Sequence, residues 1–522
     1  MKEFLELFLK LIQKLMIIPN ATDDELMARL RNGYSEMSQN EKTNCIDTIE
    51  NMVEDDHMLK LYILSVLIQV CNDERIVCDI QKILQDTAIP AINRISAMGQ
   101  LSRYLFNNVV SMDKIEYISK QISVWENEIL SVIQACEIDI GYIPYDKRNK
   151  KRIILIMEPV LGVDHSPTRR MINLYRYLIE NGYEVYVCSS NMKNIHISCT
   201  TEWYKSYWDN TLVNESGEYI YDIGDVEIPT YHINYTIDNF KNEVRNIITK
   251  IADLNPMCVI SVGDQNMLAD ICNKFTTVVT MGCTNNMPIT IAPLIARYFD
   301  CTEKQNKQYI DCKLDYQKII DVRFRDRELH KEKKAFDKED FGISKETFLI
   351  MVVGNRLDFE VTDEVLEVLD RILDNRKNVS IGFIGKCNII ENKVKNKKHN
   401  SRYIFFGETK YFEEMIGMGD LFFNPPRQGG GTGATMSIKH GIPIVTLGNC
   451  DVSAFGECFV CEDLEDMYYK VMRYIDDEEF REKQIEYCTQ IKNTFKINSK
   501  ENIRLFIKEI ENTIINIEDN ID

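Results

Sequence analysis

The chain has 522 residues, and its 62 Lys and Arg against 81 Asp and Glu give a formal net charge of −19. Apolar residues make up 44% and charged residues 27%, which is a globular mixture and excludes a long disordered chain. The acidic balance excludes a nucleic-acid polymer as the partner, because phosphate binding needs clustered Lys and Arg. At roughly 150 residues per domain, the length predicts about three domains.

Sixteen cysteines are scattered between Cys45 and Cys488 without a disulfide-scaffold pattern. Cys458 and Cys461 form the one close pair, and no histidine lies near them, so we expect ordinary thiols and no metal site. Since we also find no secretory signal, the cysteine usage indicates a reducing compartment. We therefore expect a cytoplasmic protein of bacterial type.

The first nineteen residues are rich in Leu and Ile, but Glu6, Lys10 and Lys14 interrupt them. Apolar residues recur at helical spacing, which favours an amphipathic packing helix over a membrane-surface anchor. No run of about 18 apolar residues occurs anywhere, so we expect no membrane span.

Residues 1–146 have the pattern of an all-helical N-terminal domain. Apolar residues recur every three or four positions in several segments, and alternation typical of strands is scarce. The segments are Met58–Val70, Ile76–Leu84, Ala91–Leu105 and Ile115–Ile133. No fixed period is evident, which argues against a solenoid.

The pattern changes after a charged stretch at 146–152. Ile153–Met157 is a short apolar run typical of a strand buried on both faces, and a helical pattern and a second strand, Glu184–Cys188, follow it. This order predicts a βαβ unit. Further short apolar runs are Met257–Val262, Thr277–Thr280, Phe348–Val353, Val379–Ile384, Ile404–Phe406, Leu421–Phe423 and Ile444–Leu447. Helical patterns separate many of them, which predicts α/β domains with parallel sheets.

We expect two such domains, at 147–335 and 336–498. The stretch from about Cys301 to Asp340 is charged and lacks strand signals, so it is interpreted as their link. A C-terminal segment, 499–522, holds a final helix at about Lys500–Ile517.

The strongest functional signal follows the strand Leu421–Phe423. Three glycines and a threonine precede a helical stretch that ends near His440. Glycines let the backbone approach a ligand, and the first N–H groups of a helix favour an anion. We interpret the loop as a pyrophosphate cradle, and the alternative is a tight turn. The cradle residues are Gln428, Gly429, Gly430, Gly431, Thr432 and Gly433.

Asn355 and Arg356 follow the strand Phe348–Val353. An arginine at the carboxyl end of a strand can hold a diphosphate by bidentate hydrogen bonds. The alternative is a surface ion pair with Asp358 or Glu360. The loops after the next two strands add Lys386 as a second candidate cation, and Gly407 and Tyr411 as candidates for contact with a base.

A histidine lies near a helix start in the first α/β domain, where the loop after Ile153–Met157 holds Gly162, Asp164 and His165. His165 is a candidate general base that deprotonates an acceptor hydroxyl, and the alternatives are a helix cap or passive binding of the acceptor. Later strands of the domain end at further candidates for the acceptor side, Asp264, Thr284 and Asn285.

Together these features resemble glycosyltransferases of the GT-B class over about residues 150–515. The resemblance implies an α/β protein of GT-B architecture, with two Rossmann-like domains facing across a cleft and the nucleotide-sugar in the second. Two groups look nearest. Gly354–Arg356 and Gln428–Val445 resemble a large bacterial set. His165–Thr168, Asn355–Leu357 and Gly431–Gly433 resemble the O-GlcNAc transferases and adhesin glycosyltransferases, which also carry a helical N-terminal extension.

Three positions depart from these groups. Gln428 and Met436 stand where many GT-B enzymes carry two carboxylates, and Met cannot accept a ribose hydroxyl. This disfavours a retaining enzyme and raises the prospect of a degenerate donor site. Phe359 stands where the O-GlcNAc-transferase-like group has a lysine, so Arg356 must carry the phosphate charge. No Asp-x-Asp metal motif is evident, and helix dipole and cations would replace a metal.

The resemblance implies a metal-independent, cofactor-free transfer of a hexose or N-acetylhexosamine from a nucleoside diphosphate sugar, expected to be UDP-linked. The acceptor is expected to be a protein or a glycan. The alternative is a non-catalytic GT-B partner subunit that binds a glycan or protein acceptor. Association of copies of the chain through the helical domain is a further expectation.

Overall fold

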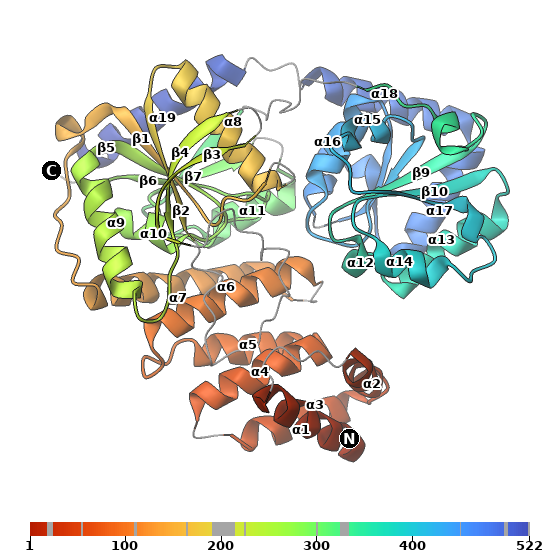
Figure 1. Cartoon of the computed structure of the whole chain (residues 1–522), viewed down its shortest axis with the longest axis horizontal. Helices are drawn as coiled ribbons and strands as arrows, with labels where there is room; N and C mark the ends of the chain where they lie inside the picture. Colours follow the sequence, from red (N-terminus) through yellow and green to blue (C-terminus); the bar gives the residue numbers. More distant parts are fainter. Residues whose placement is uncertain are drawn as a thin grey trace.

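The computed structural model describes residues 1–17, 24–53, 56–108, 112–162, 165–190, 215–223, 226–298, 301–323, 334–448, 450–494 and 499–519. These residues form a helical N-terminal block and two α/β units, each built on one sheet (Figure 1). The expected fold class is confirmed.

Seven helices make up the N-terminal block: α1 Lys2–Ile17, α2 Asp24–Ser35, α3 Gln39–Asn51, α4 His57–Cys71, α5 Glu74–Ile83, α6 Ala91–Asn107 and α7 Lys114–Ala135. Helix α1 buries Phe4, Phe8 and Leu11 within the block, so it is the packing helix that its spacing predicts. Among the described residues, no helix is long and apolar enough to cross a membrane.

The helical block shares its core with the first α/β unit. One buried cluster runs from α1 through α7 to Met267, Leu268 and Phe275 of that unit. A buried polar contact joins the same two parts, because Trp125 Nε1 of α7 donates to the Asp270 carboxylate at 2.6 Å. The helical block is therefore packed onto the first sheet and is not a separate body on a linker.

The first α/β unit has an eight-stranded sheet in the order β3-β4-β2-β1-β5-β6-β7-β8. All pairs are parallel except β3 with β4. The strands are β1 Asn149–Met157, β2 Glu184–Ser190, β3 Gly217–Asp222, β4 Glu227–Ile233, β5 Pro256–Val262, β6 Val278–Met281, β7 Leu294–Tyr298 and β8 Lys318–Val322. The helices are α8 Ser166–Glu180, α9 Phe240–Leu254, α10 Met267–Cys272 and α11 Glu303–Cys312.

Four of these strands, β3, β4, β7 and β8, were not predicted. The expectation that 301–340 lacks strands is wrong, because β8 and helix α11 lie within it. β3 and β8 are the edges of the sheet, and both mix exposed with buried residues, so neither shows a continuous apolar run. β7 includes Arg297, whose charge is paired with Asp321 on β8 at 2.7 Å.

The second α/β unit has a six-stranded parallel sheet in the order β11-β10-β9-β12-β13-β14. The strands are β9 Phe348–Val353, β10 Val379–Ile384, β11 Tyr403–Gly407, β12 Leu421–Phe423, β13 Ile444–Leu447 and β14 Val460–Cys461. The α-helices are α12 Leu357–Glu360, α13 Asp363–Asn375, α14 Asn388–Val394, α15 Phe412–Ile416, α16 Gly431–Lys439, α17 Leu464–Asp476 and α18 Glu478–Thr494.

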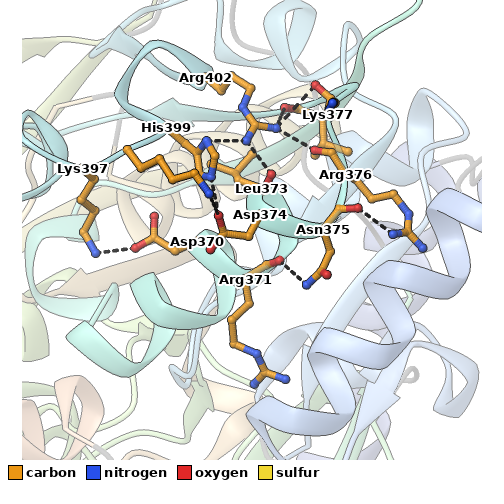
Figure 2. A network of polar contacts seen from close by, with 12 residues as sticks. Asp370, Arg371, Leu373, Asp374, Asn375, Arg376, Lys377, Lys397, His399 and Arg402 are labelled. Carbon is orange, nitrogen blue, oxygen red and sulfur yellow. Dashed lines mark hydrogen bonds and ion pairs between the residues drawn. The ribbon is translucent and has the colours of Figure 1, made fainter.

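A polar network lies where strands of this second sheet begin, at the end of the sheet formed by their amino termini (Figure 2). Arg402 donates to the carbonyl oxygens of Leu373 and Arg376 and so caps the end of α13, directly before β10. His399 bridges Arg402 and Asp374, at 2.7 Å from each. Because this end is opposite the carboxyl ends of the strands, the network is structural.

The last helix, α19 Ser499–Asp519, lies on the first unit although it follows the second in sequence (Figure 1). Its residues Ile503, Phe506 and Ile507 belong to the core of the first sheet. Near its end, Glu518 accepts a hydrogen bond from the buried Arg148 at 3.0 Å. The chain thus crosses twice between the two α/β units.

Candidate functional site

The carboxyl ends of strands from both sheets open into one cleft of about 670 Å³. This volume is within the range of pockets that hold small-molecule ligands. Residues of both α/β units and of the helical block line it. Loops at the carboxyl ends of strands are the usual ligand site of open α/β sheets.

Most of the sequence-predicted site residues meet in this cleft: His165, Asp264, Thr284, Asn285, Asn355, Arg356, Gln428, Gly429, Gly430, Gly431, Thr432 and Gly433. Gly162, Lys386, Gly407 and Tyr411 are not among the lining residues. Lys386 is exposed, and Tyr411 packs against Phe336, with ring centroids 5.9 Å apart. Asp164 lies outside the described residues.

The glycine-rich loop needs its glycines for space and for backbone geometry. Gly430 has φ +102°, and a Cβ there would lie 2.3 Å from Asn424 Oδ1. A Cβ on Gly433 would lie 3.1 Å from the Phe422 ring. The loop therefore packs closely on β12, and helix α16 starts at the cleft with the N–H groups of its first turn unsatisfied by the helix itself.

Arg356 belongs to a buried network beneath this loop. Glu360 accepts from Arg356 at 2.8 Å and from Arg427 at 2.7 Å. Arg427 also donates to the Val353 carbonyl and to Asn424. Burial favours a higher pKa for Glu360, but the two guanidinium groups outweigh it and hold that pKa below its ordinary value. Two cations share this one carboxylate, so the three groups together carry one net positive charge.

Arg356 thus forms the ion pair with Glu360 and lines the cleft at the same time. Glu360 was expected only as an alternative partner of Arg356, and Arg427 was not among the predicted site residues. Arg427 immediately precedes the cradle residues, and this position in the loop is the sequence feature from which it could have been predicted.

His165 is the residue before helix α8, and its Nδ1 lies 2.8 Å from Thr168 Oγ1. Its side chain makes no capping hydrogen bond to the helix backbone. Burial lowers the pKa of His165 to about 3, so the ring is neutral at physiological pH. A group with so low a pKa is a weak base but a good neutral hydrogen-bond partner.

Asp451, which the sequence analysis missed, lines the cleft next to the cradle. Its backbone N–H donates to the Gln428 carbonyl at 2.9 Å. Its carboxylate accepts from the Asn285 N–H of the first unit at 3.1 Å. Burial, with a smaller contribution from the Asp264 carboxylate, raises the pKa of Asp451 to about 7 against the opposing effects of the Asn285 hydrogen bond, Arg170 and Lys114. Its position shortly after the strand Ile444–Leu447 was the signal available in the sequence.

The helical block forms a third wall of the cleft at the corner between α6 and α7. The Gln428 side-chain amide donates to the Leu105 carbonyl at 2.7 Å. The Arg356 guanidinium lies 4.7 Å from the centre of the Phe106 ring, within the range of a cation–π interaction. Lys114, the first residue of α7, also lines the cleft.

No protein-family model and no curated protein match the sequence. Solved structures do match. A glycosyltransferase from Rickettsia africae ESF-5 is 14% identical with a TM-score of 0.50, over 70% of this chain and 99% of that one. A Thermobaculum terrenum O-GlcNAc transferase mutant is 10% identical with a TM-score of 0.49, over 96% of this chain and 100% of that one. The pneumococcal O-GlcNAc transferase GtfA, in complex with UDP and GlcNAc, is 8% identical with a TM-score of 0.45, over 71% and 99%.

Two facing α/β units with a shared cleft, and a last helix that returns to the first unit, define the GT-B class of fold. The likeness to the Rickettsia enzyme is in agreement. The chain has the GT-B glycosyltransferase fold, preceded by an all-helical region, as the sequence motifs predict. At this level of identity the likeness concerns the fold alone, and activity has to be argued from the cleft.

Proposed function

We propose that the protein is a glycosyltransferase that moves a hexose or N-acetylhexosamine from a UDP-sugar to a protein or glycan acceptor, without a metal ion. The observation that carries the proposal is the meeting of Arg356 with the Gly429–Thr432 loop at the start of α16, on one wall of a ligand-sized cleft.

The donor diphosphate would lie on this wall. The N–H groups at the start of α16 donate to its oxygens, and the helix dipole favours its charge. Arg356 adds a bidentate cation whose direction is fixed by Glu360 and Phe106. As the bond between the anomeric carbon and the diphosphate oxygen breaks, the same groups stabilise the negative charge of the leaving UDP.

The acceptor hydroxyl needs a base as its oxygen bonds to the anomeric carbon. Asp451 is the better candidate, because a base works best when its pKa is near the working pH, and burial raises the pKa of Asp451 to about 7. His165, the residue that the sequence singled out, has its pKa lowered to about 3 by burial. We therefore assign to His165 a neutral hydrogen bond to the acceptor or the donor sugar.

A second candidate function is a non-catalytic partner subunit with a GT-B fold. Met436 favours it, because its side chain lines the cleft where many GT-B enzymes carry a carboxylate. Such a subunit would bind a glycan or a protein acceptor without turning over a donor.

Release of UDP distinguishes the two. The purified chain is incubated with UDP-glucose, UDP-galactose, UDP-GlcNAc or UDP-GalNAc, each with and without mixed glycan and peptide acceptors. A transferase releases UDP from at least one donor, and Arg356→Ala lowers that release. Arg371→Ala, which changes an exposed arginine of the same unit paired with Glu465, serves as the control. Absence of release from every donor contradicts the proposed transferase and favours the partner subunit.

A further inference from the structure

The wall formed by the helical block carries a cation that the proposed mechanism has not used. Lys114 begins α7, lines the cleft and is only partly exposed. Within the described part of the chain, its ammonium group has no carboxylate within the 4.0 Å of an ion pair. A half-buried lysine facing a ligand cleft without a partner is costly, because desolvation penalises its charge.

Lys114 lines the same cleft as the cradle residues. It interacts electrostatically with Asp451 and Cys450, directly beside that loop, and with Lys304 of α11. A Cβ on Gly431, the first residue of α16, would lie 3.2 Å from the Asp451 Cβ. Asp451, which also lines the cleft, therefore lies against the start of α16.

Contacts to the two α/β units flank Lys114 along the chain. Trp125 of α7 is fixed to Asp270 of the first unit at 2.6 Å. At the end of α6, the Leu105 carbonyl accepts from Gln428 of the second unit at 2.7 Å. Lys114 lies between these two contacts along the chain and belongs to the same helix as Trp125.

The charge balance of the donor wall leaves room for another cation. Arg356 and Arg427 share Glu360, so these three groups carry one net positive charge, and Asp451 beside the cradle offsets part of it where it is ionised. A nucleoside diphosphate carries more negative charge than that, since a terminal phosphate alone has about −1.5 to −2 at neutral pH.

We propose that Lys114 of the helical block is the second cation of the diphosphate site, so that three parts of the chain complete one donor site. The inference rests on the proposed donor and goes beyond it by making the helical block a component of the site. Burial and Lys304 lower the pKa of Lys114, whereas Asp451 and Cys450 raise it. A bound diphosphate favours the charged form in the same way as Asp451 does, but more strongly.

The test compares Lys114→Met, Lys114→Arg and the matched control Lys120→Met, in which an exposed lysine six residues further along α7 is changed. UDP affinity is measured by calorimetry, uridine affinity by ligand-observed NMR, and the unfolding midpoint without ligand by calorimetry. Lys114→Met is expected to lower the affinity for UDP about 10-fold or more, because a charge-assisted hydrogen bond contributes about 1.5–3 kcal/mol. Uridine affinity stays unchanged, the unfolding midpoint does not fall, and Lys114→Arg keeps most of the UDP affinity.

Unchanged UDP affinity in Lys114→Met overturns the inference and leaves the proposed donor intact. An equal loss of UDP and uridine affinity also overturns it, because it shows a structural role for Lys114. Failure of the unchanged protein to bind UDP overturns the proposed donor itself, and with it the role of Lys114.

Discussion

Ser166 Oγ and Thr432 Oγ1 lie 3.1 Å apart across the cleft. Ser166 is the first residue of α8 and Thr432 the second residue of α16, so the amino-terminal ends of two helices from different units converge there. Each end carries a partial positive charge. A small anion held by Thr432 would therefore also lie near the first unit.

Replacement of Asp451 by asparagine should abolish most of the transfer and leave donor binding intact. Asparagine retains an oxygen for the Asn285 N–H but cannot take a proton, and loss of a general base costs about 10²–10⁴-fold in rate. We expect kcat to fall by about this factor, with UDP affinity nearly unchanged. Steady-state kinetics measure kcat, and calorimetry measures the affinity for UDP. A variant with full activity would remove Asp451 as the base.

The pH dependence follows from the same carboxyl group. Burial raises the pKa of Asp451 to about 7, so its basic form gains population as the pH rises through about 7. Transfer activity is therefore expected to rise over that range, with no limb from His165, whose pKa is about 3. A pH profile of kcat measures this. The residual activity of Asp451→Asn should no longer rise with pH over that range. A rise that persists would assign the titrating group to another residue.

Glu360→Gln should destabilise the second unit. It leaves two guanidinium groups of a buried network without their carboxylate, and breaking a buried ion pair by removing one partner typically costs about 3–5 kcal/mol. Urea unfolding measures the loss. Glu465→Gln, which removes the exposed partner of Arg371, is the matched control and should cost less than about 1 kcal/mol. Equal effects of the two variants would contradict the buried network.

Trp125→Phe tests the joint between the helical block and the first unit. It removes a 2.6 Å hydrogen bond to the buried Asp270 and leaves that carboxylate short of a donor. A hydrogen bond to a charged group contributes about 1.5–3 kcal/mol, so we expect a loss of stability in this range. The loss is measured by urea unfolding, monitored with one probe in the helical block and one in the first unit. A loss well below this range would show that apolar packing alone holds the joint.

The pKa of Asp270 gives that joint a pH dependence. Burial raises this pKa from 3.8 to about 6, despite the hydrogen bonds from Thr290 and Trp125. The contribution of Asp270 to stability is therefore fully present below the unfolded pKa near 3.8 and is lost as the pH rises through about 6. Asp270→Asn lacks this loss, so the unfolding free energy of the unchanged protein should fall relative to the variant between pH 4 and pH 7. Parallel curves would contradict the raised pKa.

The parallel strands at the centres of both sheets could be predicted because they are short, continuous apolar runs. β9 and β10 lie where Phe348–Val353 and Val379–Ile384 indicate. The edge strands β3 and β8 could not be predicted in this way, because one side of each is exposed and polar residues interrupt the pattern. The expected domain limits at 146, 335 and 498 stay a prediction.

The position of the cradle and of Arg356 at the cleft could be predicted because both follow strands, and their binding of a donor stays a prediction. Asp451 and Lys114 were not predicted, because no local motif marks them and the position of Asp451 shortly after the strand Ile444–Leu447 is its one sequence signal. Asp451 acts through a contact with the Asn285 backbone 166 residues away, and Lys114 enters the cleft only because the helical block packs onto the first sheet.

The central claim is that Arg356 and the start of α16 bind a nucleoside diphosphate. Calorimetry with UDP tests it most directly, on the unchanged chain and on the double variant Arg356→Ala with Thr432→Ala. We expect the unchanged chain to bind UDP and the double variant to lose about 10²-fold or more in affinity, at about 1.5–3 kcal/mol for each charge-assisted contact. Equal UDP affinity in the two proteins, or none in the unchanged chain, would contradict the account.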